Sequence, residues 1–258
     1  MTTTFRKVNV LGTSVAALNP EAAVRLIDGW LRENTTGRYV SVVDVHCIMQ
    51  AYRRPEVRES YNSADACMPD GMPLTWVGRL RGHRTMSRVY GPDLMLAMLD
   101  VASRTGRTSY FLGGADGVAE ELRVRMERRF PGLSVVGTFT PPFRSLTADE
   151  RTTLVNTIND LRPDLVWVGL GAPKQDLFMA EFHALLNCKV MIGVGAAFDF
   201  HAGRIRQAPR WMMSVGLEWL FRLCMEPRRL APRYLRNNPA FLWHIFLQQT
   251  GIRSYPLD

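Results

Sequence analysis

Residues 165–194 read LVWVGLGAPKQDLFMAEFHALLNCKVMIGV, and they carry the strongest signal for the architecture of the chain. Leu165–Gly169 and Val190–Val194 are short apolar runs that predict buried strands. Between them Gln175–Leu186 predicts a helix, and Pro173 suits a helix start. Two buried strands joined by a helix indicate a right-handed βαβ crossover, which predicts parallel pairing in an α/β fold.

The same alternation of strand and helix extends from this unit toward the N-terminus. The other predicted strands are Lys7–Leu11, Val15–Ala17, Tyr39–Val43, Ala64–Met68, Ser109–Leu112 and Leu133–Phe139. The other predicted helices are Pro20–Leu31, His46–Arg53, Met72–Leu80, Pro92–Arg104, Val118–Arg129 and Thr147–Leu161. Strands of about five residues between helices of about 11 to 15 predict a Rossmann-like, mostly parallel sheet flanked by helices.

From Arg210 onward only helical periodicity is present. We therefore expect two parts, a Rossmann-like domain over residues 1–206 and a helical, Arg- and Trp-rich C-terminal appendage over residues 207–258. Residues 201–258 contain nine arginines and three acidic residues, so these last 58 residues hold six of the eight net positive charges. Arg interleaved with Trp and Tyr suits an anionic membrane surface, where each basic residue contributes about 1 kcal/mol. Nucleic acid and a merely solvated helical surface are the alternatives.

Composition narrows the class of protein further. The chain has 258 residues, of which 47% are hydrophobic and 22% charged, as in globular proteins. No apolar run reaches the ~18 residues of a spanning helix, and Met1–Val10 lacks the apolar core of a secretion signal. The four cysteines form no CxxC pair, which predicts reduced thiols in a cytoplasmic protein and excludes a disulfide framework or zinc ribbon.

Ligands of parallel sheets bind beyond the carboxyl ends of the strands. The loops after Val43, Met68, Leu112, Gly169 and Val194 should therefore converge on one cleft. The five histidines show no HxH or HExxH spacing, so no histidine-based metal site is predicted.

Glycines in these loops suit the binding of a phosphate. Gly113, Gly114 and Gly117 lie between a strand and a helix, where backbone amides and the helix dipole attract anions. A plain tight turn explains the same glycines equally well. The pattern is GGxxG in mid-chain, whereas a dinucleotide-dependent oxidoreductase favours GxGxxG near the N-terminus with an acid ~20 residues later.

Two further loops contain candidate ligand contacts. Lys174 lies in the first turn of a helix, where a cation opposes the dipole unless an anion compensates; Gly171 and Gln175 are beside it. Gly195 and Asp199 follow the next strand, and Asp199 is either a helix cap or a polar contact to a ligand.

Asp70 and Arg88 are the candidate chemical groups. Asp70 follows a predicted strand, and a carboxylate in a partly apolar cleft has a raised pKa that suits a general base. An Asx-turn or helix cap is the alternative role for Asp70. Arg88 precedes a helix that begins at Gly91-Pro92, and it is either a clamp for a diphosphate or an ordinary surface arginine.

Taken in order, the motifs of the chain resemble one family, the WecG/TagA/CpsF glycosyltransferases (glycosyltransferase family 26). The resemblance covers roughly residues 8–240 and is most specific over 193–227. It is carried by PDG at 69–71, RVYGPDL at 88–94, FLGG at 111–114, PPF at 141–143, GLGAPKQ at 169–175, GVGAAFD at 193–199, AG at 202–203, APRW at 208–211, GLEW at 216–219 and EP at 226–227.

The resemblance implies inverting transfer of a sugar from a UDP-sugar to a polyprenyl-diphosphate-linked saccharide. The sugar would be N-acetylmannosamine, its uronate or another hexose, and the product would belong to bacterial cell-surface polysaccharide biosynthesis. No cofactor or bound metal is implied, and the enzyme would act on the inner face of the cytoplasmic membrane. A nucleotide-cofactor oxidoreductase and a non-enzymatic membrane- or RNA-binding protein are the competing interpretations. A homo-oligomer through Trp211–Leu223 is possible, and nucleic acid is not an expected partner.

The resemblance also assigns residues. It makes Asp70 the base, places Arg88 at the diphosphate and matches Gln175 to the family's GxPKQ motif. The donor site would comprise Gly113, Gly114, Gly117, Gly171, Lys174, Gln175, Gly195 and Asp199. The acceptor and membrane surface would comprise Arg210, Arg222, Arg228, Arg229 and Arg233.

One segment departs from the family pattern. Where the family has Thr-x-Asn, this chain has Val42 at the Thr position and Asp44 at the Asn position. Ser41 would need a small shift to supply the missing hydroxyl. Asp44 competes with Asp70 as the candidate base, and a different donor sugar would explain the change.

Overall fold

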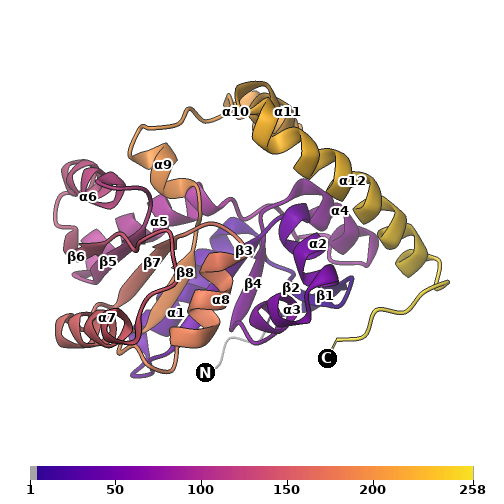
Figure 1. Ribbon diagram of the computed structural model, residues 1–258. Coiled ribbons are helices and arrows are strands. Elements are labelled where there is room, and N and C mark those ends of the chain that lie inside the picture. Colours follow the sequence, from indigo (N-terminus) through magenta and orange to yellow (C-terminus); the bar gives the residue numbers. More distant parts are fainter. Residues whose placement is uncertain (1–4, 258) are drawn as a thin grey trace.

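A six-stranded parallel sheet forms the centre of the computed structural model, which describes residues 5–257 (Figure 1). The strand order is β4-β3-β8-β7-β5-β6. The bounds are β3 Arg38–Val43, β4 Ala66–Pro69, β5 Thr108–Gly113, β6 Ser134–Phe139, β7 Leu165–Gly169 and β8 Val190–Gly193. All pairs are parallel, so every strand ends at the same edge of the sheet. The expected α/β architecture is confirmed.

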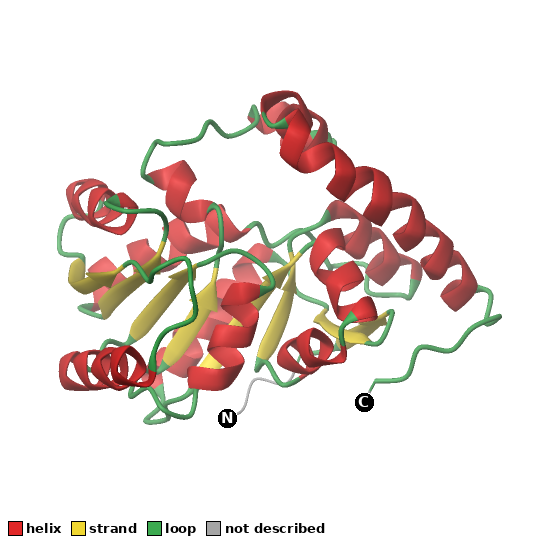
Figure 2. Cartoon of the chain, viewed as in Figure 1, coloured by secondary structure: helices red, strands yellow, loops and turns green. Residues whose placement is uncertain are grey.

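Helices cover both faces of this sheet (Figure 2). On one face lie α1 (Pro20–Arg32), α5 (Gly91–Thr105), α6 (Val118–Arg129) and α9 (Ala197–His201). On the other lie α2 (Val45–Arg53), α3 (Pro55–Asn62), α7 (Ala148–Leu161) and α8 (Lys174–Phe182). Because side chains alternate along a strand, Trp167 packs into the first layer while its neighbours Val166 and Val168 pack into the second.

The chain leaves neighbouring strands toward opposite faces. β5 is followed by α6 on one face, and β7, its neighbour in the sheet, is followed by α8 on the other. Such a divergence opens a crevice between the carboxyl ends of the two strands. The same divergence occurs between β3, followed by α2, and β8, followed by α9.

An antiparallel hairpin, β1 (Lys7–Val10) and β2 (Thr13–Ala16), packs beside the sheet with α4 (Met72–Leu80). Its turn residues Leu11 and Gly12 have φ values of 53° and 85°, as a tight two-residue turn requires.

The C-terminal segment consists of α10 (Arg210–Ser214), α11 (Glu218–Met225) and α12 (Pro227–Gln249), which confirms the predicted helical character. In Figure 1, α12 runs past α2 at one end of the sheet. Phe241 is buried in the same apolar cluster as Val8, Val10 and Ile48, so α12 is anchored in the core around the N-terminal hairpin. Within residues 5–257, no helix combines the length and apolar composition that a membrane crossing requires.

Two helices were missed by the sequence analysis. α3 begins at Pro55, directly after the predicted helix His46–Arg53; Arg54 caps both helices, and the proline fits the first turn of the second. The five-residue α9 was not distinguished from the apolar run that follows β8. The predicted helix Gln175–Leu186 ends early, at Phe182.

Candidate active site

A cavity of about 1210 Å³ lies at the carboxyl edge of the sheet. As predicted, the loops that follow β3, β4, β5, β7 and β8 all contribute to its lining. The β6–α7 loop, α11 and α12 complete the wall. Ligand sites commonly measure roughly 300–1,000 Å³, so this cavity is at the large end of the range for a ligand-binding cleft.

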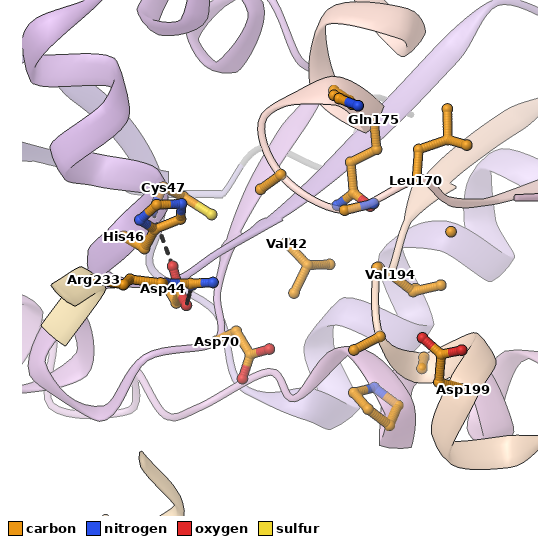
Figure 3. A pocket seen from close by; sticks show the side chains of 18 of the residues that line it. Val42, Asp44, His46, Cys47, Asp70, Leu170, Gln175, Val194, Asp199 and Arg233 are labelled. Carbon is orange, nitrogen blue, oxygen red and sulfur yellow. Dashed lines mark hydrogen bonds and ion pairs between the residues drawn. The ribbon is translucent and has the colours of Figure 1, made fainter. Parts of the chain in front are cut away.

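Asp70 is fixed at the end of β4. Its backbone N–H donates to the carbonyl of Val43 at 2.8 Å, which continues the pairing of β3 with β4 by one step. The side chain points into the cavity beside Val42 (Figure 3).

Arg88 approaches Asp70 from the loop before α5. Its Nε donates to Asp70 Oδ1 at 2.8 Å and also to the Asp70 carbonyl, and its Nη2 lies 2.8 Å from the same Oδ1. The guanidinium stacks on the ring of Tyr90 at 4.3 Å. Its Nη2 also contacts Glu218 Oε2 from α11, at 2.6 Å. Arg88 therefore lies between two carboxylates.

Burial raises the pKa of Asp70 to about 6, although Arg88 acts in the opposite direction; Glu218 and Asp44 add to the increase. Burial alone would lower the pKa of Arg88, but its two carboxylate partners outweigh that effect and raise it. Asp70 thus has a proton affinity suited to general-base work near neutral pH, beside a permanently charged arginine.

Asp44 is held differently. It caps α2 by accepting from the Cys47 N–H at 2.9 Å, and its Oδ2 lies 2.8 Å from Arg233 Nη2 (Figure 3). Burial acts to raise the pKa of Asp44, but Arg233 and the Cys47 N–H outweigh it, so the pKa lies below its usual range. A carboxylate neutralised in this way is a weaker base than Asp70.

The departure from Thr-x-Asn leaves no hydroxyl at this point. Val42 presents its methyl groups to the cavity, whereas Ser41 points to the opposite face of β3 and is fully buried. There Ser41 interacts with Asp176 rather than with the cavity. The suggested compensation by Ser41 is wrong in this structure, because one residue along a strand reverses the face.

Most of the predicted donor residues gather in the cavity. Gly114, Gly171, Lys174, Gln175, Gly195 and Asp199 line it, whereas Gly113 and Gly117 do not. A Cβ on Gly113 would lie 2.6 Å from the backbone of Gly169, so close approach of β5 to β7 explains this glycine. Gly117 precedes α6 with a φ of 79°.

Gln175 braces its own loop. Its Oε1 accepts from the Gly171 N–H at 3.2 Å, and the side chain is almost fully buried.

Burial raises the pKa of Asp176, the next residue, to about 7; the Tyr61 hydroxyl donates to its carboxylate at 3.1 Å. Burial also raises the pKa of Asp199, with Glu226 adding and Arg204 opposing.

The predicted arginines divide into two groups. Arg222, Arg229 and Arg233 line the cavity, whereas Arg210 and Arg228 lie outside it. Arg210 instead pairs with Asp93 at 2.6 Å on the surface.

Sequence reasoning missed two contributors to the wall. Glu218 lies in the quoted GLEW motif, and a lone acid among aromatic residues was the available signal. His46 lies two residues after Asp44, and its Nδ1 lies 2.8 Å from Asn237 Nδ2 on α12. Burial, helped by Arg233, lowers the pKa of His46 to about 4, so the ring is neutral and accepts this hydrogen bond.

Within the described part of the chain, no three His, Cys, Asp or Glu side chains gather as metal ligands do.

Comparison with known proteins places this geometry in a family. The chain is 29% identical over 197 residues to the N-acetylglucosaminyldiphosphoundecaprenol N-acetyl-beta-D-mannosaminyltransferase of Bacillus spizizenii, covering 76% of this chain and 75% of that protein. It is 28% identical over 193 residues to the enzyme of the same name in Bacillus subtilis, covering 75% and 73%. The family model for glycosyl transferases of the WecG/TagA/CpsF type matches residues 8–255. A match over almost the whole chain, on a parallel sheet whose loops unite the predicted motifs, means that this protein is a glycosyltransferase belonging to the WecG/TagA/CpsF family.

Proposed function

We propose that the enzyme transfers an N-acetylmannosaminyl or related hexosyl group from a UDP-sugar to a sugar linked to a polyprenyl diphosphate, with inversion. Support for the acceptor comes from the names of the two Bacillus relatives, which specify a diphosphoundecaprenol-linked sugar. Support for the chemistry comes chiefly from one observation: Asp70 lines the cavity with its pKa raised to about 6 and is oriented by Arg88.

The proposed reaction is a single displacement. The acceptor hydroxyl gives its proton to Asp70 as its oxygen attacks the anomeric carbon, and the bond to UDP breaks with its electron pair leaving on the diphosphate. Inversion follows because the attack comes from the side opposite the leaving group. Asp70 suits this role better than Asp44, whose charge is satisfied by Arg233.

Positive charge must also meet the departing diphosphate. Arg88 already uses Nε and Nη2 on its two carboxylates, which leaves its Nη1 for a phosphate oxygen. Lys174 lines the same cavity and adds further charge. Backbone amides near Gly114 and Gly195 complete the proposed donor site, in which charge is stabilised by fixed donors and no metal is required.

We further propose that the C-terminal segment rests on the cytoplasmic face of the membrane, where a polyprenyl-linked acceptor is found. Its surface exposes large apolar side chains, with Trp211 64%, Leu242 63% and Trp243 59% accessible. Arginines such as Arg228 and Arg236 lie among them on α12. Such a mixture suits the anionic headgroup layer. Arg222, Arg229 and Arg233 are at the cavity end of this surface, where the acceptor diphosphate would arrive.

A transfer assay tests the proposal. Purified enzyme is given UDP-N-acetylmannosamine, then a panel of other UDP-hexoses, with a short-chain polyprenyl-diphospho-N-acetylglucosamine acceptor. We expect a disaccharide-lipid whose new linkage, measured by NMR, has the opposite anomeric configuration to the donor. Absence of transfer from every donor, together with no rise in melting temperature on adding UDP, would overturn it. NAD(P)H is the matched ligand control, and it should leave the melting temperature unchanged.

A further inference from the structure

Glu218 reaches the base from the far end of the sequence. It lies in the first turn of α11, in the C-terminal segment, and only 8% of the residue is exposed. Its Oε2 is 2.6 Å from Arg88 Nη2, and the same Nη2 is 2.8 Å from Asp70 Oδ1. One nitrogen of Arg88 is therefore shared between the proposed base and a second carboxylate.

This sharing changes what Arg88 does to Asp70. An arginine paired with a single aspartate stabilises the ionised form and makes that carboxylate a poor base. Here Arg88 is also bound to Glu218, so Asp70, Arg88 and Glu218 together carry one net negative charge. When Asp70 accepts a proton, the three groups become neutral as a set, and Arg88 keeps an ionised partner.

We propose that Glu218 is a positioning residue for the transfer reaction: it shares Arg88 with Asp70 and so preserves the proton affinity that Asp70 needs as the base. The proposal rests on the proposed function for the role of Asp70. No proton passes through Glu218, since the acceptor proton ends on Asp70 and the electron pair of the broken bond leaves with UDP.

The other charged and titratable groups around Asp70 do not provide the same effect. Asp44, from the β3–α2 loop, has its charge offset by Arg233 from α12. Tyr90, stacked on Arg88, is kept neutral because burial and the neighbouring carboxylates raise the pKa of its hydroxyl. Arg222, one turn beyond Glu218 on α11, acts on Tyr90 in the opposite direction. Burial and Glu218 are therefore the main influences that offset Arg88, and Asp44 adds a smaller one.

A structural consequence is that the chemistry depends on the docking of α11. The Asp70–Arg88 pair is built entirely from the β4–α4 and α4–α5 connections, whereas Glu218 belongs to the segment proposed to meet the membrane. A displaced α11 would leave Arg88 to Asp70 alone and make the base weaker.

The titration of Asp70 tests this inference without any substrate. Full-length protein labelled with [¹³Cγ]aspartate is titrated by NMR, and Asp70→Asn identifies the resonance. In wild type we expect a midpoint near pH 6. In Glu218→Gln the midpoint should fall by about one unit or more, since a unit charge is lost a few ångströms from the carboxyl. Glu120→Gln, which removes an equal charge from the exposed Glu120–Arg123 pair on α6, should leave it unchanged.

Conservative rescue separates charge from packing. Glu218→Asp keeps the carboxylate, so Asp70 should titrate closer to its wild-type midpoint than in Glu218→Gln. An Asp70 midpoint that stays at the wild-type value in folded Glu218→Gln would overturn the inference. If circular dichroism shows that Glu218→Gln does not fold, the Asp70 midpoint in Glu218→Asp decides alone. An Asp70 midpoint that lies above the wild-type value, by more than the shift in Glu120→Gln, contradicts the proposal.

Kinetics give the second readout. The acidic limb of kcat/KM for Glu218→Gln should move to lower pH by the same amount, and its plateau should fall, because a weaker base transfers the proton less well. Loss of activity with an unmoved limb would make Glu218 merely structural. If no variant, wild type included, transfers sugar, the proposed function fails while the NMR result still decides the role of Glu218 toward Asp70.

Discussion

Arg233 on α12 reaches Asp44 at the start of α2, with 2.8 Å between Nη2 and Oδ2. This ion pair joins the C-terminal helix to the rim of the cavity, a few residues from the point where Asn237 contacts His46 and Arg53. It also accounts for the different states of the two candidate bases, because it neutralises Asp44 and leaves Asp70 with the raised pKa.

The Asp44–Arg233 pair is expected to contribute modestly to stability. Both side chains are partly exposed, at 37% and 24%, and such pairs are worth about 0.2–1 kcal/mol. A double-mutant cycle with Asp44→Asn and Arg233→Met, followed by urea unfolding, should give a coupling energy of that size that decreases at 1 M salt. Strictly additive effects of the two substitutions would show that the pair is not formed in solution.

Asp176 should make the protein less stable as the pH rises. Its pKa is about 7 in the folded protein and ~3.9 when unfolded. Below pH ~4 both states are protonated; between pH ~4 and ~7 the unfolded state releases the proton first, so stability falls. Asp176→Asn removes this cost, and its advantage over wild type should grow by about 2–4 kcal/mol from pH 4 to pH 8. A constant difference in unfolding free energy across that range would contradict the prediction; exposed Asp160→Asn is the control.

Gly113 at the end of β5 and Gly117 before α6 should respond differently to alanine. A Cβ on Gly113 meets the Gly169 backbone at 2.6 Å, so Gly113→Ala should cost about 3 kcal/mol or more. A Cβ on Gly117 meets nothing within 4 Å, and Gly117→Ala should cost only the left-handed backbone conformation, about 1–2 kcal/mol. Chemical denaturation measures both. Equal losses would mean that β5 and β7 are not as close as described.

Membrane binding should depend on the exposed apolar face of α12. Truncation is a poor test, because Phe241 and Tyr255 are buried in the core around the hairpin. Trp243→Ser with Phe246→Ser instead removes two exposed rings, and we expect at least about tenfold weaker partitioning onto vesicles of phosphatidylglycerol.

The matched control for that experiment is Val124→Ser with Leu185→Ser, which changes two exposed apolar residues on α6 and after α8. It should sediment with the vesicles as wild type does. Equal binding of both double variants would remove the membrane role from α12. A change in oligomeric state on gel filtration, with vesicle binding intact, would assign the face to a subunit contact.

Much of the fold was predictable from local patterns, because buried strands and helix starts have short-range signals. Leu165–Gly169 and Val190–Val194 were recognised as strands from apolar composition alone. Their place at the centre of the sheet was not predicted, since strand order depends on contacts between distant segments. α3 was missed because a proline that ends one helix also begins the next.

The site was predictable only in part, for a related reason. Asp70 and Arg88 lie at the ends of neighbouring elements, and their motifs led to both. Glu218 is distant in sequence, and only the folded α11 brings it to Arg88. Ser41 and Val42 are adjacent in sequence but face different sides of the sheet, so only Val42 lines the cavity.

The identity of the base is tested most directly by comparing the turnover of Asp70→Asn and Asp44→Asn in the sugar-transfer assay, after melting curves have confirmed that both are folded. We predict that Asp70→Asn lowers kcat by about 10²–10⁴, the usual contribution of a general base, while Asp44→Asn lowers it by less than about 10-fold. Near wild-type turnover by Asp70→Asn, or the larger loss in Asp44→Asn, would contradict the account.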